Sequence, residues 1–212
     1  RINVIQADLH VHTTYSSDSA ITPKTLIEQL VTHNFIKVAA VTDHDTVRGC
    51  GVTRQLASAY PDILIIPGVE ISTPSGDIAV LGAEEMPPQP WTVEGVVDFA
   101  RDRACVSVVV HPYREYGMGD WARNYKFDAI EVFNGCSTPS GNQQAEHLAK
   151  LMGLPGVAGS DAHHMREVGT CATRFQQPLA HAAALVPELK CEPVPAMRRA
   201  FEVGPELIYF LT

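Results

Sequence analysis

Five apolar, β-branched runs in this chain each lead directly into a cluster of histidine and acidic residues. In the first cluster, His10 and His12 lie two residues apart at the end of an expected strand. Alternate residues of an extended segment point to one face, so both imidazoles can be aimed at one point. The remaining clusters are Thr42-Asp43-His44-Asp45, Gly68-Val69-Glu70, His111-Pro112 and Gly159-Ser160-Asp161-Ala162-His163-His164.

Helical patterns separate these runs. Pro23 opens the first helix, whose expected apolar face consists of Leu26, Ile27, Leu30 and Val31. Further helices are expected over about residues 46–59, 92–103 and 140–152, and near residue 180. Strands are expected over about residues 3–9, 38–41, 63–66, 105–110, 129–133, 156–159, 169–175 and 207–211, with a hairpin over 71–81.

This alternation predicts an α/β fold. Repeated strand–helix units imply right-handed crossovers and a parallel sheet, either open or closed into a barrel. In barrels of this kind the active site lies at the carboxyl ends of the strands, and each cluster sits at such an end. We therefore expect the clusters to meet in one site.

Composition narrows the class of protein. With 212 residues, 45% of them hydrophobic and 19% charged, the chain fits one globular domain over residues 1–212. A net charge of −8 without any lysine and arginine run argues against stable nucleic-acid binding, but bound cations would still allow a small anionic substrate. Five scattered cysteines fit a cytoplasmic location, and neither a signal peptide nor a membrane span is expected. The oligomeric state is left open.

The residue types at the strand ends suit divalent metal ions. Imidazoles together with carboxylates favour zinc, manganese or iron over magnesium alone. The ligands are too numerous for one ion, so two or three ions are expected. Metals about 3.5–4 Å apart can clamp the oxygens of a phosphoryl group, and a bridging water that loses a proton would be the nucleophile. The candidate ligands are His10, His12, Asp18, His44, Glu70, His111, Asp161 and His163.

The order of these motifs resembles that of the PHP family (polymerase and histidinol phosphatase domains). The motifs are Asp-Leu-His-x-His-Thr, Thr-Asp-His-Asp, Gly-Val-Glu, His-Pro and Ser-Asp-Ala-His, and they run from residue 8 to about residue 170. The resemblance implies a distorted barrel of seven β/α units. It also implies a stand-alone metal-dependent phosphoesterase, since family members include histidinol-phosphate phosphatases, nucleotide phosphodiesterases and polymerase-associated exonucleases.

The resemblance further implies how the ligands are shared among the metals. One metal would be held by His10, His12, Glu70 and Asp161, and a second would share Glu70 and take His111. A third would use Asp18, His44 and His163. Family members usually have a further histidine ligand in the strand after the Gly-Val-Glu hairpin. Here Asp77 takes that place in Gly76–Gly82; we assign it to the metal site, with a turn residue as the alternative.

Residues beside these ligands are candidates for handling the substrate. Glu70 and Asp161 are expected to be catalytic through the metals they hold, and His164 is expected to donate a proton to the leaving group. Arg114 and Arg166 each follow a ligand motif and match phosphate oxygens bidentately, although either could be a surface arginine. Asp43, Asp45 and Asn134 are expected to orient ligands or to cap the following helices. Glu131 is expected to be a buried partner behind a ligand.

The sequence thus predicts a metal-dependent hydrolase of a small phosphate mono- or diester. An amidohydrolase that cleaves a carbon–nitrogen bond is the alternative enzyme, because related metal barrels use the same hydroxide. A non-catalytic module that binds metal or a ligand is the alternative from another class. The complete set of ligand residue types speaks against that module.

Overall fold

The computed structural model of the chain describes residues 5–175, 198–199 and 209–210. Its α-helices are α1 (Pro23–Thr32), α2 (Arg48–Ala57), α3 (Val93–Asp102) and α4 (Pro139–Met152). Two short 3-10 helices are η1 (Gly119–Asn124) and η2 (Met165–Glu167). The strands are β1 (Ile5–Val11), β2 (Ile36–Val41), β3 (Leu64–Thr73), β4 (Gly76–Leu81), β5 (Val106–Val109), β6 (Ala129–Asn134), β7 (Gly156–Gly159), β8 (Thr173–Phe175), β9 (Arg198–Arg199) and β10 (Tyr209–Phe210).

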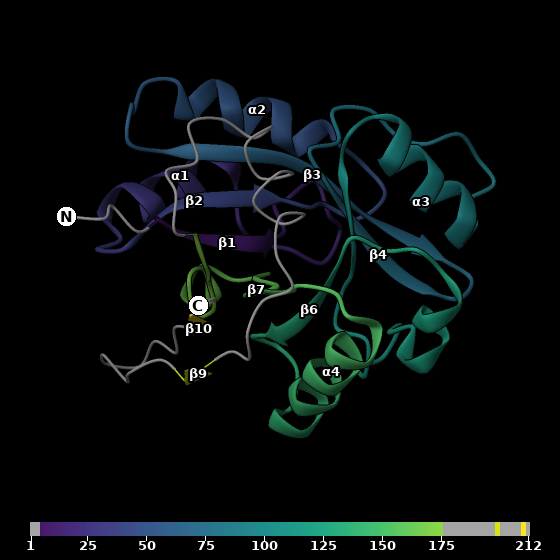
Figure 1. Cartoon of the computed structure of the whole chain (residues 1–212). Coiled ribbons are helices and arrows are strands. Elements are labelled where there is room, and N and C mark those ends of the chain that lie inside the picture. The colour runs from purple at the N-terminus through teal and green to yellow at the C-terminus, as the bar shows by residue number, and fades with distance from the viewer. Residues whose placement is uncertain (1–4, 176–197, 200–208, 211–212) are drawn as a thin grey trace.

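Eight strands form one sheet in the order β7-β6-β5-β4-β3-β2-β1-β8. Most neighbours are parallel, but β4 is antiparallel to both β3 and β5, and β8 is antiparallel to β1. The segment after β7 returns to β1, where Asp161 N–H donates to His10 O at 2.8 Å and His12 N–H donates to Ala162 O at 3.0 Å. The sheet is thereby nearly closed, and the expected distorted barrel is confirmed. Figure 1 shows α2, α3 and α4 on the outside of the strands.

Local sequence explains where the helices begin and end. Thr22 and Thr138 cap α1 and α4, with a side-chain oxygen that accepts a backbone N–H, and each is followed by a proline in the first turn. Gly153 ends α4 in the left-handed conformation at φ 65°. Val31, expected on the buried face of α1, is 38% exposed, so that expectation was wrong. The buried stripe of α1 ends at Leu30, and Val31 lies beyond its edge near the helix terminus.

The strand expected to end at residue 66 continues to Thr73 as β3. Pro67 lacks an N–H donor, but its carbonyl accepts a hydrogen bond from Gly82 N–H at 2.6 Å, and the strand continues through it. Glu70 therefore lies inside β3 and not at its end. The helix expected near residue 180 lies outside the described residues. Of the strand expected at 207–211, only β10 is described, and it pairs with β9.

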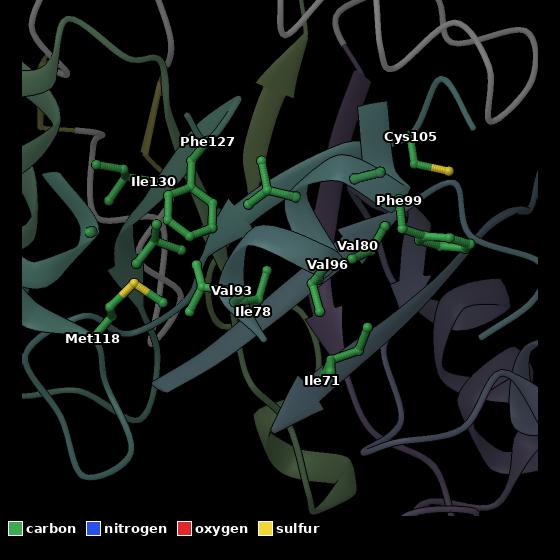
Figure 2. Packing of buried hydrophobic residues seen from close by; sticks show 14 of the residues in the cluster. Ile71, Ile78, Val80, Val93, Val96, Phe99, Cys105, Met118, Phe127 and Ile130 are labelled. Carbon is green, nitrogen blue, oxygen red and sulfur yellow. The ribbon is translucent and has the colours of Figure 1, made fainter. Parts of the chain in front are cut away.

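The two faces of the β3–β4 hairpin have different surroundings. Val69 and Ile71 of β3 pack outward with Val96 and Phe99 of α3 in one apolar cluster. Ile71, Val96 and Phe99 are labelled in Figure 2. Successive strand residues point to opposite faces, so Glu70 points the other way, into the barrel. The barrel interior holds a second apolar cluster, which includes Leu9, Ile66, Ala79 and Leu81. Among the described residues, no helix is long and apolar enough to cross a membrane.

Close packing at the closure of the barrel makes Gly159 a sensitive position. An added Cβ would lie 2.8 Å from His10 N, closer still to His10 Cβ, and 3.0 Å from Glu131 Oε1. We expect Gly159→Ala to lower the free energy of unfolding by about 1–3 kcal/mol through overpacking. The control is Gly51→Ala in α2, where no atom of the described residues lies within 4 Å of the added Cβ; alanine there should stabilise the protein by about 0.5–1 kcal/mol. Chemical denaturation measures both, and equal effects would contradict the prediction.

Candidate metal centre

Four buried side chains converge at the carboxyl ends of β1 and β7. The Nε2 atoms of His10 and His12 are 3.1 Å apart, and each lies 3.1 Å from Glu70 Oε2. Asp161 Oδ1 completes the set at 3.5 Å from His10 Nε2 and 3.3 Å from His12 Nε2. All four side chains are at most 1% exposed. We call these residues the first group.

A second group shares Glu70 and adds Asp77 and His111. Glu70 turns Oε2 to the first group and Oε1 to His111 Nε2, 2.8 Å away. One ligand atom of each residue in the second group lies within 4.8 Å of the others. Asp77 lies in β4 and not in the preceding turn, and its side chain is buried. Burial and the nearby charge of Glu70 raise the pKa of Asp77 to about 6.

A third group lies on the solvent side. Nitrogens of His12, His44 and His163 lie within 4.8 Å of one another. Asp18 Oδ2 is 3.3 Å from His163 Nε2 and 3.5 Å from His44 Nε2. Asp18 is 51% exposed and His44 31%, so a substrate can approach from this side. The structure thus brings together all nine residues that the sequence nominated as metal ligands.

The surrounding protein orients three of these histidines through Nδ1. His10 Nδ1 lies 2.9 Å from Glu131 Oε1, and His163 Nδ1 lies 2.8 Å from the carbonyl oxygen of Asp161. His12 Nδ1 lies 3.1 Å from Ser16 Oγ. An acceptor at Nδ1 keeps the proton there, which leaves the Nε2 lone pair facing the group. This is the orientation that a metal ligand requires.

Several buried polar atoms in the centre have no hydrogen-bond partner among the described residues. They are Asp161 Oδ1 and the Nδ1 atoms of His44 and His111. A buried carboxylate oxygen without a donor is costly, and a cation would satisfy it. Since Asp161 Oδ1 faces two imidazole nitrogens and Glu70, the donor set fits a divalent metal with mixed nitrogen and oxygen ligands.

Protons and metals compete for this centre. Burial lowers the pKa of His12, but its close contacts with the carboxylates of Asp161 and Glu70 outweigh burial and raise the pKa to about 9. Metal binding must therefore displace protons from the imidazoles. The backbone is also held in an unfavourable conformation, with φ 29° at His111 and φ 56° at Asp161. Such strain is typical of functional sites.

The three residues nominated to handle the substrate occupy different environments. Arg114 is 32% exposed, and its Nη1 lies 2.6 Å from Asp161 Oδ2 and 3.2 Å from Asn134 Oδ1. Arg166 is exposed on η2. His164 is 61% exposed, with Nδ1 3.5 Å from Glu167 Oε1. Within residues 5–175, neither Arg166 nor His164 forms a hydrogen bond or an ion pair with a residue of the three groups.

Two orienting residues were not singled out in the sequence. Ser16 Oγ bonds to His12, donates to Asp43 Oδ1 at 3.3 Å and accepts His44 N–H at 2.8 Å. Asp8 accepts from Ser160 Oγ at 2.5 Å and from Gly169 N–H at 2.9 Å, which ties β1 to the segment after β7. Serine is common in loops, so the only sequence signal for the role of Ser16 was its position four residues after His12.

The three groups predict at least two divalent ions per chain. We expect elemental analysis of the purified or reconstituted protein to find them, and chelation to lower the thermal midpoint. Bound ligand stabilises the native state by about 2.7 kcal/mol when present at 100 times its Kd. Less than one equivalent after reconstitution, with an unchanged midpoint, would contradict the cluster.

A nearly closed α/β barrel with histidines and carboxylates gathered at its carboxyl end defines the class of divalent-metal-dependent hydrolases. The family model described as the PHP domain matches residues 8–152, and the chain belongs to this family. A second model, described as PHP-associated, matches residues 139–193. The resemblance noted in the sequence is confirmed.

Relatives in sequence are found in archaea and bacteria. The uncharacterized protein MJ1587 of Methanocaldococcus jannaschii is 30% identical over 142 residues, which cover 61% of this chain and 82% of the relative. MJ0417 of the same organism is 27% identical over 183 residues, or 82% of this chain and 71% of the relative. The 5'-3' exoribonuclease Rnm of Salmonella typhimurium is 45% identical over 67 residues, which are 31% of this chain and 22% of that enzyme.

Solved structures share the fold at lower identity. PsfC from Pseudomonas syringae superposes with a TM-score of 0.67 at 20% identity, covering 89% of this chain and 90% of PsfC. An amidohydrolase from Chromobacterium violaceum gives 0.64 at 18% identity, covering 82% and 93%. A protein assigned as a metal-dependent phosphoesterase from Bifidobacterium adolescentis gives 0.59 at 15% identity, covering 74% and 87%. These likenesses support the barrel.

Proposed function

We propose that the protein is a metal-dependent phosphoesterase that hydrolyses a small phosphate mono- or diester with two or three ions of zinc, manganese or iron. The observation that carries the proposal is the position of Glu70 between the first and second groups, with the Arg114 guanidinium beside Asp161. When bound, divalent cations neutralise phosphoryl oxygens and activate water. The substitution of Asp77 for the usual histidine leaves the second group with two carboxylates.

The position of each residue in the centre indicates its role in the proposed reaction. Buried imidazoles hold the carboxylates of Glu70 and Asp161 in place, so neither side chain needs to move during the reaction. Arg114 is partly exposed, and its remaining N–H groups can reach equatorial phosphate oxygens. His164 stays our proposed proton donor to the leaving group, acting from the exposed edge of the segment that carries Asp161 and His163.

A substrate panel tests the proposal. Metal-stripped protein is assayed with manganese, zinc or iron against phosphate monoesters, phosphodiesters and a short RNA carrying a 5'-phosphate. The RNA is included because of the 67-residue match to Rnm. We expect turnover of at least one small ester only when metal is added. No turnover of any ester by fully loaded protein would reject the phosphoesterase.

An amidohydrolase is the second candidate. It is favoured by the Chromobacterium violaceum structure, which is named as an amidohydrolase and superposes over 82% of this chain. Linear and cyclic amides are therefore included in the same panel. Amide cleavage without ester cleavage would replace our first proposal with this one.

A further inference from the structure

One buried carboxylate lies behind both the first and the second group. Glu131 in β6 is 2% exposed. Its Oε1 lies 2.9 Å from Nδ1 of His10, a member of the first group. Its Oε2 accepts the backbone N–H of His111, a member of the second group, at 2.8 Å, and Asn134 Nδ2 at 2.9 Å. A single side chain thus contacts one ligand residue of each group.

We propose that Glu131 is the positioning residue of the metal centre, which selects the tautomer of His10 and holds the backbone of His111. It thereby sets the affinity of two metal positions at once. The inference rests on the metal centre of the proposed function, but it does not depend on which bond the enzyme cleaves.

The tautomer of His10 follows from the chemistry of its partner. An ionised carboxylate can only accept hydrogen bonds, so Nδ1 of His10 must carry the proton. In the neutral ring, Nε2 is then unprotonated and carries a free lone pair. That lone pair faces His12 Nε2 and Glu70 Oε2, both 3.1 Å away. The Glu131 contact therefore leaves His10 ready to bind a metal without a change of tautomer.

The second contact supports a strained backbone. His111 has φ 29°, a conformation that few non-glycine residues adopt. In the described part of the chain its ring Nδ1 has no hydrogen-bond partner, so the ring is not held from behind as the ring of His10 is. The N–H···Oε2 bond from His111 to Glu131 anchors the backbone that directs Nε2 toward Glu70.

Glutamine has nearly the same shape but cannot make the same bonds. Glu131 accepts three donors, two at Oε2 and one at Oε1. If the amide oxygen of glutamine serves His111 and Asn134, the amide NH₂ faces His10 Nδ1. The ring must then move its proton to Nε2, where it blocks the lone pair. If the amide is turned round, its NH₂ faces two N–H donors and both bonds are lost.

The test is Glu131→Gln, with Asp128→Asn as the matched control. Asp128 precedes β6, and its carboxylate accepts from Ser107 N–H and Ser107 Oγ at 2.9 Å each. Zinc affinity is measured by competition with a chelator, and zinc content by elemental analysis. We expect Glu131→Gln to weaken zinc binding by about 10–100-fold, as loss of a carboxylate behind a ligand histidine does elsewhere, and the control to bind like the parent.

Imidazole NMR of the zinc-loaded protein labelled with nitrogen-15 histidine gives a second readout that does not depend on activity, and its result on the parent alone already tests the proposal. The parent should show a slowly exchanging Nδ1–H on His10, which Glu131→Gln should lose. A parent without this Nδ1–H overturns the proposal even if the variant does not fold. Parent-like zinc affinity in a folded Glu131→Gln protein overturns it too. Weakened zinc binding without any esterase activity in the parent would reject the proposed function and leave this inference standing.

Discussion

Replacement of Glu70 by glutamine is expected to lower phosphoesterase kcat/KM by more than about 100-fold and to reduce the metal content. Glu70 is fully buried, and its two oxygens face four imidazoles: His10, His12 and His44 at Oε2 and His111 at Oε1. Burial raises the pKa of Glu70, but the neighbouring histidines lower it well below its usual range, so the side chain is an anion. An amide has one acceptor oxygen and no charge, so it cannot serve both groups.

The control for this experiment is Glu84→Gln, which removes a charge from an exposed ion pair with Arg54. We expect it to keep the parent activity, since surface pairs contribute little. Kinetics on the ester found in the panel, elemental analysis and circular dichroism are recorded for both variants. A folded Glu70→Gln protein with parent activity would reject the shared-carboxylate centre.

Much of the fold could be predicted because hydrophobic period and caps are local signals. The β-branched runs and the helices opened by Pro23 and Pro139 lie close to where the pattern put them. The length of β3 could not be predicted, because proline cannot donate to the ladder and is rarely found within a central strand. The exposure of Val31 depends on what packs beside α1, which the helical period does not specify.

In the candidate site, too, local sequence signals predicted some features, while others depend on tertiary packing. Residues directly at strand ends were gathered as expected, because the barrel brings those ends together. After β7 the chain turns through η2 before it reaches β8. Glu167 Oε2 accepts the N–H groups of His163 and His164 at 2.9 Å each and fixes this turn. His164 and Arg166 are exposed as a result. The link from Glu131 to both His10 and His111 joins three strand ends and has no local signature.

Arg114→Ala is expected to remove about 2–4 kcal/mol of transition-state stabilisation. Each ~1.4 kcal/mol lowers kcat/KM tenfold. The guanidinium is half-buried beside Asp161, where its positive charge can meet phosphoryl oxygens out of bulk water. Metal content should remain, because Asn134 Nδ2 still donates to Asp161 Oδ2 at 3.2 Å. Lysine at this position should recover only part of the loss, since it lacks the planar fork of donors.

Arg166→Ala provides the matched comparison, because both arginines follow a ligand motif but only Arg114 contacts a ligand in the described structure. We expect the Arg166 variant to stay close to the parent in kcat/KM. Steady-state kinetics with zinc-loaded proteins and elemental analysis separate phosphate binding from metal loss. If Arg114→Ala hydrolyses the ester as fast as the parent while Arg166→Ala is slow, the phosphate lies on the η2 side of the centre. Parent rates in both variants would mean that neither guanidinium contacts the phosphoryl group.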